Sequence, residues 1–317
     1  MAFAFVFPGQ GSQSVGMLAD LAAAEPQVRA TFEEASQVLG YDLWQLVAEG
    51  PADALNATER TQPAMLSAGV ATWRVWNARG GALPAVLSGH SLGEFTALVC
   101  AQALKFPAAV ELVRYRGELM QQAVPVGSGA MAAILGLEDA QIEAACAEAA
   151  QGAIVEPANF NSPGQVVIAG DAAAVARAIE AARARGAKRA VLLPVSVPAH
   201  SSLMRAAAQR LAERLGALDL GRPKIRYVSA VDAAAHEEPE DIRALLVRQL
   251  SSPVRWTDTL RAVSAAPIAQ VIECGPGKVL TALNRRIERR DGLSFLALED
   301  PTSLQAALTA TRGDTHA

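Results

Sequence analysis

The chain has few of the residues from which disulfide frameworks and metal centres are built. Its 317 residues include three cysteines and four histidines. Cys100, Cys146 and Cys274 are scattered through apolar sequence without C-x-x-C spacing, and no histidines have zinc-binding spacing. We therefore expect reduced cysteines that serve as packing residues. The pattern predicts no metal site and disfavours a metal-dependent mechanism.

The sequence also lacks a long apolar run and a strong net charge. The apolar start at 1–7 has no basic flank or cleavage site, and Pro8-Gly9 ends it well short of a membrane span. The formal net charge of −4 predicts no general affinity for nucleic acid or an anionic membrane. We expect a soluble, cytoplasmic protein with neither kind of partner.

What is present is the composition of a globular α/β protein, with 51% hydrophobic and 19% charged residues. Short apolar strand patterns alternate with helical patterns, which favours a mainly parallel sheet covered by helices. The expected strands are 3–7, 85–88, 225–229, 268–273 and 293–297. The clearest expected helices are 61–77, 108–123, 202–215 and 241–249.

A second pattern interrupts this alternation. Strands are expected at 130–135, 154–160, 165–169 and 188–195, with helices at 139–150 and 172–185. The order βαββαβ is typical of a ferredoxin-like module. We therefore predict a larger α/β subdomain formed by 1–126 and 198–317, and a small ferredoxin-like subdomain, 127–197, inserted between its two parts.

Residues 89–93 read Gly-His-Ser-Leu-Gly, a G-x-S-x-G pentapeptide between an expected strand and an expected helix at 92–104. This context predicts a sharp turn that presents Ser91 as a covalent nucleophile. Free backbone N–H groups at the start of the helix would face developing negative charge, as acyl transfer requires. The alternative interpretation is a tight turn without chemistry.

A serine nucleophile needs a base, and the choice of histidines is small. His316 lies in a polar tail, His236 lies in an acidic loop, and the side chain of His90 should diverge from its neighbour Ser91 on a sharp turn. His200 remains, at the exit of the small module and just before a helix. Its alternative role is that of a polar residue at a helix start.

Six ordered segments carry a family resemblance that runs nearly the length of the chain. They are Phe-Pro-Gly-Gln-Gly-Ser-Gln at 7–13, Gly-His-Ser-Leu-Gly-Glu at 89–94, Asn-Phe-Asn-Ser-Pro-Gly-Gln at 159–165, Val-Ser-Val-Pro-Ala-His at 195–200, the segment 245–256, and Gly-Pro-Gly-Lys-Val-Leu at 275–280. Together they resemble the malonyl-CoA:acyl carrier protein transacylases of bacterial fatty-acid synthesis. The resemblance implies an α/β-hydrolase-like larger subdomain with an inserted ferredoxin-like one.

The resemblance also implies site residues. Ser91 would be the nucleophile, and His200 would be its base and acid, oriented by the backbone carbonyl of Gln249. The backbone N–H groups of Gln10 and Leu92 would form the oxyanion hole. Arg116 would bind the malonyl carboxylate, although its helical pattern alone indicates an ordinary surface cation.

The implied reaction is a ping-pong transfer of malonyl from malonyl-CoA through Ser91 to the phosphopantetheine thiol of holo acyl carrier protein, without a cofactor. A monomer is the expected oligomeric state. The basic run 285–290, with Lys188 and Arg189, would help to dock the acidic carrier protein; its alternative role is that of a solvated helix end.

Other readings remain open from the residues. A serine esterase or thioesterase would use the same elbow, with an acidic triad member and release of free acid. A scaffold that keeps a dead acyltransferase fold would require loss of Ser91 or His200, yet both are present. An acyltransferase of a polyketide or malonate-decarboxylase system would share the chemistry with a different acceptor. A dinucleotide loop at 9–14 is disfavoured because Ser14 replaces the third glycine.

Overall fold

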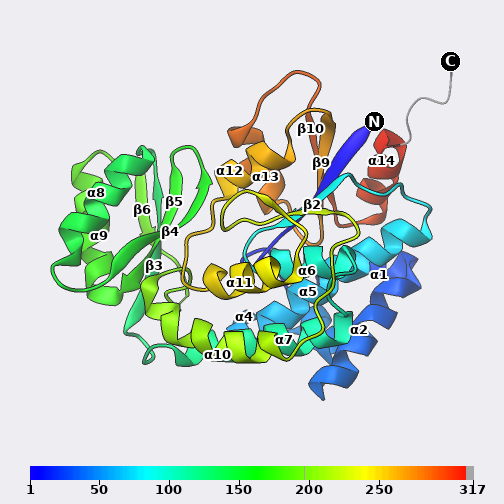
Figure 1. Cartoon of the computed structure of the whole chain (residues 1–317), viewed down its shortest axis with the longest axis horizontal. Coiled ribbons are helices and arrows are strands. Elements are labelled where there is room, and N and C mark those ends of the chain that lie inside the picture. Colours follow the sequence, from blue (N-terminus) through cyan, green and yellow to red (C-terminus); the bar gives the residue numbers. More distant parts are fainter. Residues whose placement is uncertain (196, 312–317) are drawn as a thin grey trace.

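The structure, a computed structural model, describes residues 1–195 and 197–311. Ser196 and the segment 312–317, which contains His316, lie outside the described residues. Two β-sheets divide the chain into a larger part and a smaller part that lie side by side (Figure 1). The predicted fold class, a mainly parallel sheet with helices plus a smaller βαββαβ unit, is confirmed.

The larger sheet has the strand order β10-β9-β1-β2-β7-β8. All neighbouring strands pair in parallel except β7 and β8, which are antiparallel. The strands are β1 (Ala2–Phe7), β2 (Val86–Gly89), β7 (Arg226–Val228), β8 (Ala235–His236), β9 (Ile268–Cys274) and β10 (Ser294–Leu298). Because β1 and β2 are parallel neighbours, the loops that follow them lie at the same edge of the sheet.

Strand β1 is buried on both faces, as expected for a central parallel strand. Phe3, Phe5 and Phe7 pack into one hydrophobic cluster, which includes Trp76. Ala4 and Val6 face a second cluster on the other side of the sheet. The alternating large and small side chains therefore join two helical layers, and they fix the position of the loop that follows β1.

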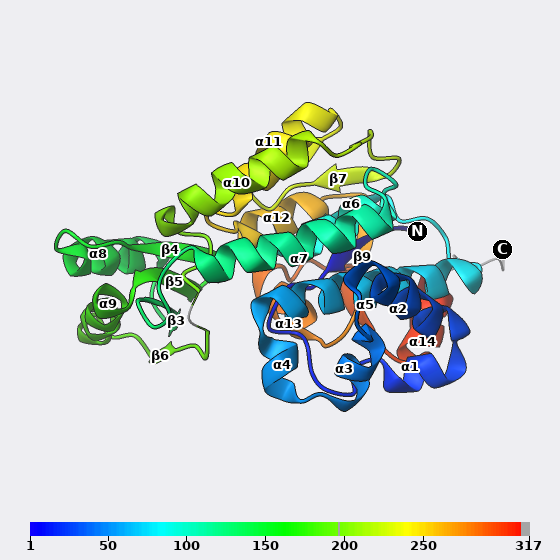
Figure 2. The same ribbon diagram turned by 90° about the horizontal axis from the view of Figure 1, so that it is seen from below.

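Helices cover both faces of this sheet. The face of the three phenylalanines is covered by a larger layer in which α5 and α7 pack side by side and the pair α10–α11 packs beyond them (Figure 2). Two helices, α12 and α13, cover the other face. The helices of this part are α1 (Ala19–Ala24), α2 (Pro26–Leu39), α3 (Leu43–Glu49), α4 (Ala52–Asn56), α5 (Thr58–Ala78), α6 (Gly93–Cys100), α7 (Phe106–Gln122), the 3-10 turn η1 (Ser202–Met204), α10 (Arg205–Gly216), α11 (Pro239–Gln249), α12 (Trp256–Val263), α13 (Val279–Ile287) and α14 (Pro301–Thr311).

The smaller sheet is antiparallel and has the order β4-β5-β3-β6. Its strands are β3 (Gly129–Leu135), β4 (Val155–Ser162), β5 (Gln165–Asp171) and β6 (Arg189–Leu192), and its helices are α8 (Asp139–Ala150) and α9 (Ala172–Ala184). Both helices pack on one face of this sheet and enclose a separate hydrophobic cluster (Figure 1). The unit lies inside the predicted insertion, whose limits at 127 and 197 stay a prediction.

Backbone hydrogen bonds join the two parts next to the site. The Phe160 N–H donates to the Val254 carbonyl at 2.9 Å, and the Val254 N–H donates to the Ala158 carbonyl at 2.9 Å. Strand β4 of the smaller sheet is thereby fixed to the segment that follows α11. This junction follows the end of α11, which carries Gln249, after a short loop.

Candidate active site

The G-x-S-x-G segment forms the predicted strand-to-helix elbow between β2 and α6. Ser91 has a φ of 50°, a left-handed conformation that a side-chain-bearing residue adopts at an energetic cost. The flanking glycines make the turn possible: a Cβ on Gly89 would lie 1.9 Å from the Gly93 carbonyl carbon, and one on Gly93 would lie 2.1 Å from the Phe7 carbonyl oxygen. Only glycine fits at either position, and the strained turn projects Ser91 from the sheet edge.

The loop after β1 lies against this elbow, as the shared sheet edge predicts. A Cβ on Gly9 would approach the His90 carbonyl oxygen to 2.5 Å. Gln10 follows Gly9, and Leu92 follows Ser91, so the two predicted oxyanion-hole donors come from adjacent loops. Among the described residues, neither backbone N–H is used in a hydrogen bond. Both are therefore available to an oxyanion.

His200 meets Ser91 directly. Its Nε2 lies 2.8 Å from the Ser91 Oγ, and its Nδ1 lies 2.8 Å from the Gln249 carbonyl oxygen. Since a carbonyl can only accept, Nδ1 carries the proton and Nε2 is free to accept the serine proton. His200 has a φ of 63°, and its own N–H donates to the Leu250 carbonyl at 3.1 Å. The end of α11 thus fixes both the backbone and the ring.

The environment keeps this imidazole neutral. His200 is 4% exposed. Burial, reinforced by the positive charge of Arg116, lowers the pKa of His200 from 6.5 to about 3, against the opposing effect of the Gln249 carbonyl. The ring is consequently unprotonated at neutral pH, which is the state that can accept a proton.

Arg116, from α7, is the cation of the site. It is 1% exposed, and its Nη2 donates to the Ser91 Oγ at 3.2 Å. Its other partners are amide oxygens, the Oε1 atoms of Gln62 and Gln249, both at 2.9 Å. Burial lowers the pKa of Arg116 to about 10, so it remains charged at neutral pH. The surface position that its helical pattern alone indicates is wrong; the position implied by the family resemblance is the observed one.

Arg116 forms no ion pair with a carboxylate in the part of the chain that the structure describes. Its Nε is buried and has no hydrogen-bond partner among the described residues. The guanidinium also lies over the Phe95 ring, at 5.5 Å from its centroid. A buried cation beside a nucleophile, with neutral hydrogen-bond acceptors, is suited to bind an acidic group of a substrate.

Three residues of the site were not predicted from the sequence. Gln62 binds the guanidinium, while Glu94 and Tyr227 form a buried hydrogen bond next to the Gln249 side chain. A usable signal existed for Glu94 alone, because it is the one charged residue in the mostly apolar stretch 92–104. Gln62 and Tyr227 have ordinary helix and strand contexts.

Two other histidines have partners of their own. The His90 Nε2 lies 2.8 Å from the Asn161 Oδ1 of β4, and the His90 ring packs against Trp256. His236 pairs with Asp232 at 3.0 Å. Among the described histidines, His200 is therefore the one that reaches the nucleophile.

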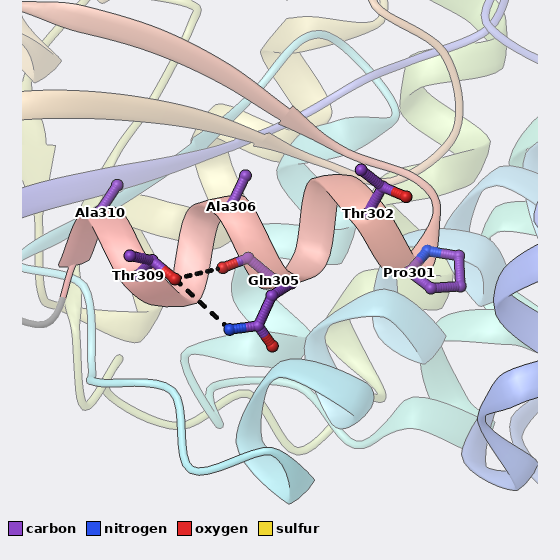
Figure 3. A pocket seen from close by; sticks show the side chains of 6 residues that line it. All are labelled: Pro301, Thr302, Gln305, Ala306, Thr309 and Ala310. Carbon is purple, nitrogen blue, oxygen red and sulfur yellow. Dashed lines mark hydrogen bonds between the residues drawn. The ribbon is translucent and has the colours of Figure 1, made fainter.

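The surface has a shallow hollow that runs along α14, away from these residues in the sequence. The residues that line it are uncharged (Figure 3). Two of them, Gln305 and Thr309, are hydrogen-bonded to each other along the helix. None of the predicted site residues lines it.

An elbow serine, a neutral histidine and unused main-chain donors on an α/β sheet are the arrangement typical of proteins that form acyl-serine esters. Within that class, a backbone carbonyl in place of an acidic triad member and a buried arginine beside the serine set this site apart from a Ser-His-Asp hydrolase. The profile of the acyl transferase domain matches residues 4–295. The chain belongs to this acyl transferase family.

Similarity to characterised relatives extends over almost the whole chain. It is 55% identical to the malonyl CoA-acyl carrier protein transacylase of Salmonella typhimurium, across 97% of this chain and 99% of the relative. The protein of the same name from Bacillus subtilis is 42% identical, with 96% of each covered.

Solved structures show the same fold. An acyl carrier protein S-malonyltransferase from Vibrio cholerae has a TM-score of 0.93 and 56% identity, with 96% of this chain and 99% of that chain covered. A malonyl-transacylase solved in complex with a type II PKS acyl-carrier protein has a TM-score of 0.96 and 54% identity, with 98% and 100% covered.

Proposed function

We propose that this protein transfers a malonyl group from malonyl-CoA to the phosphopantetheine thiol of an acyl carrier protein and so supplies fatty-acid synthesis. One observation carries the proposal: a single serine Oγ lies 2.8 Å from a neutral histidine and 3.2 Å from a buried arginine. The first contact provides a nucleophile, and the second provides a partner for an acidic acyl group. The names of the relatives agree with this donor and this acceptor.

In the first half-reaction the Ser91 Oγ attacks the thioester carbonyl while the His200 Nε2 takes its proton. The carbonyl oxygen becomes negative, and the N–H groups of Gln10 and Leu92 stabilise it. The tetrahedral intermediate collapses as the C–S bond breaks. His200 returns the proton to the CoA sulfur, and a malonyl-Ser91 ester remains.

In the second half-reaction the carrier-protein thiol repeats these steps in reverse order. His200 takes the thiol proton, the thiolate sulfur attacks the ester, and the C–O bond to Ser91 breaks. The Ser91 Oγ then receives the proton from His200. The same groups serve both directions because the two thiols are chemically alike, and no group beyond the two substrates is consumed.

Arg116 would select the donor. The carboxylate of malonate can pair with the guanidinium, which now has only neutral amide acceptors and the serine hydroxyl. An acetyl group fills the same space without this partner and leaves a buried cation uncompensated. We therefore expect an uncharged acyl group to be a poor substrate.

Intact-protein mass spectrometry tests the function. Mixing with malonyl-CoA is expected to add one malonyl group to the parent and none to Ser91→Ala. When holo acyl carrier protein is then added, the adduct should disappear from the enzyme, and the carrier protein should gain the mass of one malonyl group. Decay to free malonate without transfer would instead make the protein a hydrolase, and absence of an adduct would contradict malonyl-CoA as the donor.

The basic end of α13 is a candidate docking surface for the carrier protein. Arg285 and Arg286 are both exposed. The Arg285 guanidinium donates one hydrogen bond to the Phe295 carbonyl, and the Arg286 guanidinium donates one to the Gln165 Oε1. Their positive charge has no carboxylate partner among the described ion pairs. An acidic partner would therefore find these cations available.

Charge reversal tests this surface. The double variant Arg285→Glu, Arg286→Glu is expected to raise the KM for the carrier protein about tenfold and to leave the rate of acylation by malonyl-CoA unchanged. A matched control, Arg29→Glu with Lys105→Glu, makes the same change in net charge at exposed positions of α2 and before α7. Equal effects of the two pairs on the carrier-protein KM would rule out docking at α13.

A further inference from the structure

A fully buried carboxylate lies behind the active site. Glu94, in the first turn of α6, is 0% exposed. The Tyr227 hydroxyl donates to its Oε2, and the Gln249 Nε2 donates to its Oε1 at 2.7 Å. The carboxylate does not contact the Ser91 Oγ or the His200 ring, so it belongs to neither the nucleophile nor the base.

Glu94 determines which way the Gln249 amide points. The Gln249 Nε2 has two acceptors, the Glu94 Oε1 and the Ser91 carbonyl oxygen at 3.0 Å. A flipped amide would turn its oxygen toward both of these acceptors and its NH₂ group toward the Arg116 guanidinium, which has only donors. With Glu94 in place, the Gln249 Oε1 instead accepts from the Arg116 Nη2 at 2.9 Å.

Gln249 is also the residue whose backbone carbonyl holds His200. A single residue at the end of α11 therefore contacts the base through its main chain and the donor-selecting cation through its side chain. Orientation of this one residue matters for both partners, and the Glu94 carboxylate, which accepts the shorter of the two hydrogen bonds from Nε2, helps to fix its side chain.

We propose that Glu94 is a positioning residue that sets the malonyl selectivity of the site by holding the Gln249 amide with its oxygen toward Arg116. The inference rests on the proposed function, because it names the determinant behind the same arginine. Without this anchor the guanidinium would lose a fixed acceptor, and its nitrogens would no longer be presented to a malonyl carboxylate in one orientation.

The negative charge of Glu94 also favours binding of a malonyl carboxylate, because it helps to keep Arg116 charged. Burial raises the pKa of this carboxyl, while hydrogen bonds from Tyr227, Gln249, Ser229 and the Ala230 backbone lower it. Its negative charge raises the pKa of Arg116 and so favours the charged guanidinium. The anchoring of Gln249 needs only a lone pair on Oε1, which a glutamine at this position would also supply.

The test compares donors rather than rates alone. Glu94→Met keeps the length of the side chain but removes the acceptor, and it is expected to lower the ratio of kcat/KM for malonyl-CoA to that for acetyl-CoA about tenfold or more. Glu94→Gln can present its own carbonyl oxygen to Gln249 and should restore the ratio to within about threefold of the parent. A general loss of packing would lower kcat/KM for both donors together and leave their ratio unchanged.

Glu273 supplies the matched control. It is also 0% exposed, and its carboxylate accepts from the N–H groups of Leu280 and Thr281 at the start of α13 instead of facing the site. Glu273→Met is expected to lower the Tm and leave the donor ratio as in the parent. Should Glu94→Met fail to fold, Glu94→Asp replaces it, because the shorter side chain keeps the charge but withdraws from Gln249.

A double-mutant cycle with Gln249→Met decides whether Glu94 acts through that amide. The further fall in the donor ratio caused by the Glu94 substitution should disappear in this background. An unchanged ratio in a folded Glu94→Met variant, or an equal fall with and without the Gln249 amide, would overturn the inference. A parent protein that fails to transfer malonyl would overturn the proposed function instead.

Discussion

Replacing Arg116 with alanine is expected to lower kcat/KM for malonyl-CoA by about 100- to 1,000-fold and to leave or raise the activity toward acetyl-CoA. Loss of a buried, charge-assisted pair to a carboxylate costs several kcal/mol, which corresponds to this range. Acetyl-CoA makes no such pair, and removal of the uncompensated cation relieves the penalty that an uncharged acyl group otherwise meets. Steady-state kinetics with the two donors measures both effects.

The same helix provides the control for this prediction. Arg114 lies two residues earlier on α7, where it pairs with Glu118 at a partly exposed position. Arg114→Ala should leave donor selectivity as in the parent. Arg116→Lys keeps a positive charge but not the forked donor geometry, and it should recover part of the malonyl activity. Retention of full malonyl preference by Arg116→Ala would contradict the assignment.

Arg114 and Arg116 also show where prediction from the sequence stops. Both occur in one short stretch of a helix, and nothing in their immediate context separates the partly exposed Arg114 from Arg116, which is 1% exposed. Burial of Arg116 depends on the Gln62 and Gln249 amides, which come from α5 and α11. Family resemblance places Arg116 in the site, whereas local pattern reasoning places it on the surface.

The elbow at Ser91 was predictable because, unlike the burial of Arg116, it does not depend on distant parts of the sequence. Its geometry is local: a strand, two glycines without space for a Cβ, and a helix start are all encoded within a few residues around Ser91. His200 followed by elimination, since the chain has few histidines. Its contact with Ser91, across 109 positions of sequence, is tertiary and could be expressed only as an expectation.

Among the strands and helices, too, some were predicted accurately from local sequence and others were not. The expected strands 3–7 and 268–273 match β1 and β9 closely, because buried parallel strands have continuous apolar sequence. The expected helix 92–104 and strand 188–195 are shorter in the structure, at Gly93–Cys100 and Arg189–Leu192. Segment 19–56, to which no helix was assigned, forms α1–α4. The short lengths of α1, α3 and α4, 6, 7 and 5 residues, leave little periodicity to detect, whereas α2, with 14 residues, was missed despite its length. The two-residue edge strand β8 was missed because it is short.

Acylation of Ser91 is expected to be independent of pH across the range in which a free histidine titrates. Below its pKa a histidine is protonated and cannot accept the serine proton. Because burial and the charge of Arg116 lower the pKa of His200 from 6.5 to about 3, the base stays active as the pH falls from about 8 to 5. Stopped-flow release of CoA should give a flat kcat/KM profile over this range. His200→Ala should be about 1,000-fold slower or worse throughout, and a fall centred near pH 6.5 in the parent would contradict a buried neutral base.

The low pKa has a cost, since a weak base takes the serine proton with little driving force. The acidic donor can offset this cost itself. When a malonyl carboxylate pairs with Arg116, it neutralises the positive charge that is the second cause of the lowered pKa of His200. The pKa of the base should therefore rise in the malonyl-CoA complex and remain low in the acetyl-CoA complex. Since kcat reports groups in the bound complex and kcat/KM reports the free enzyme, the acid limb of kcat should lie at higher pH than that of kcat/KM for malonyl-CoA alone. Identical limbs for both donors would mean that Arg116 selects the carboxylate without strengthening the base.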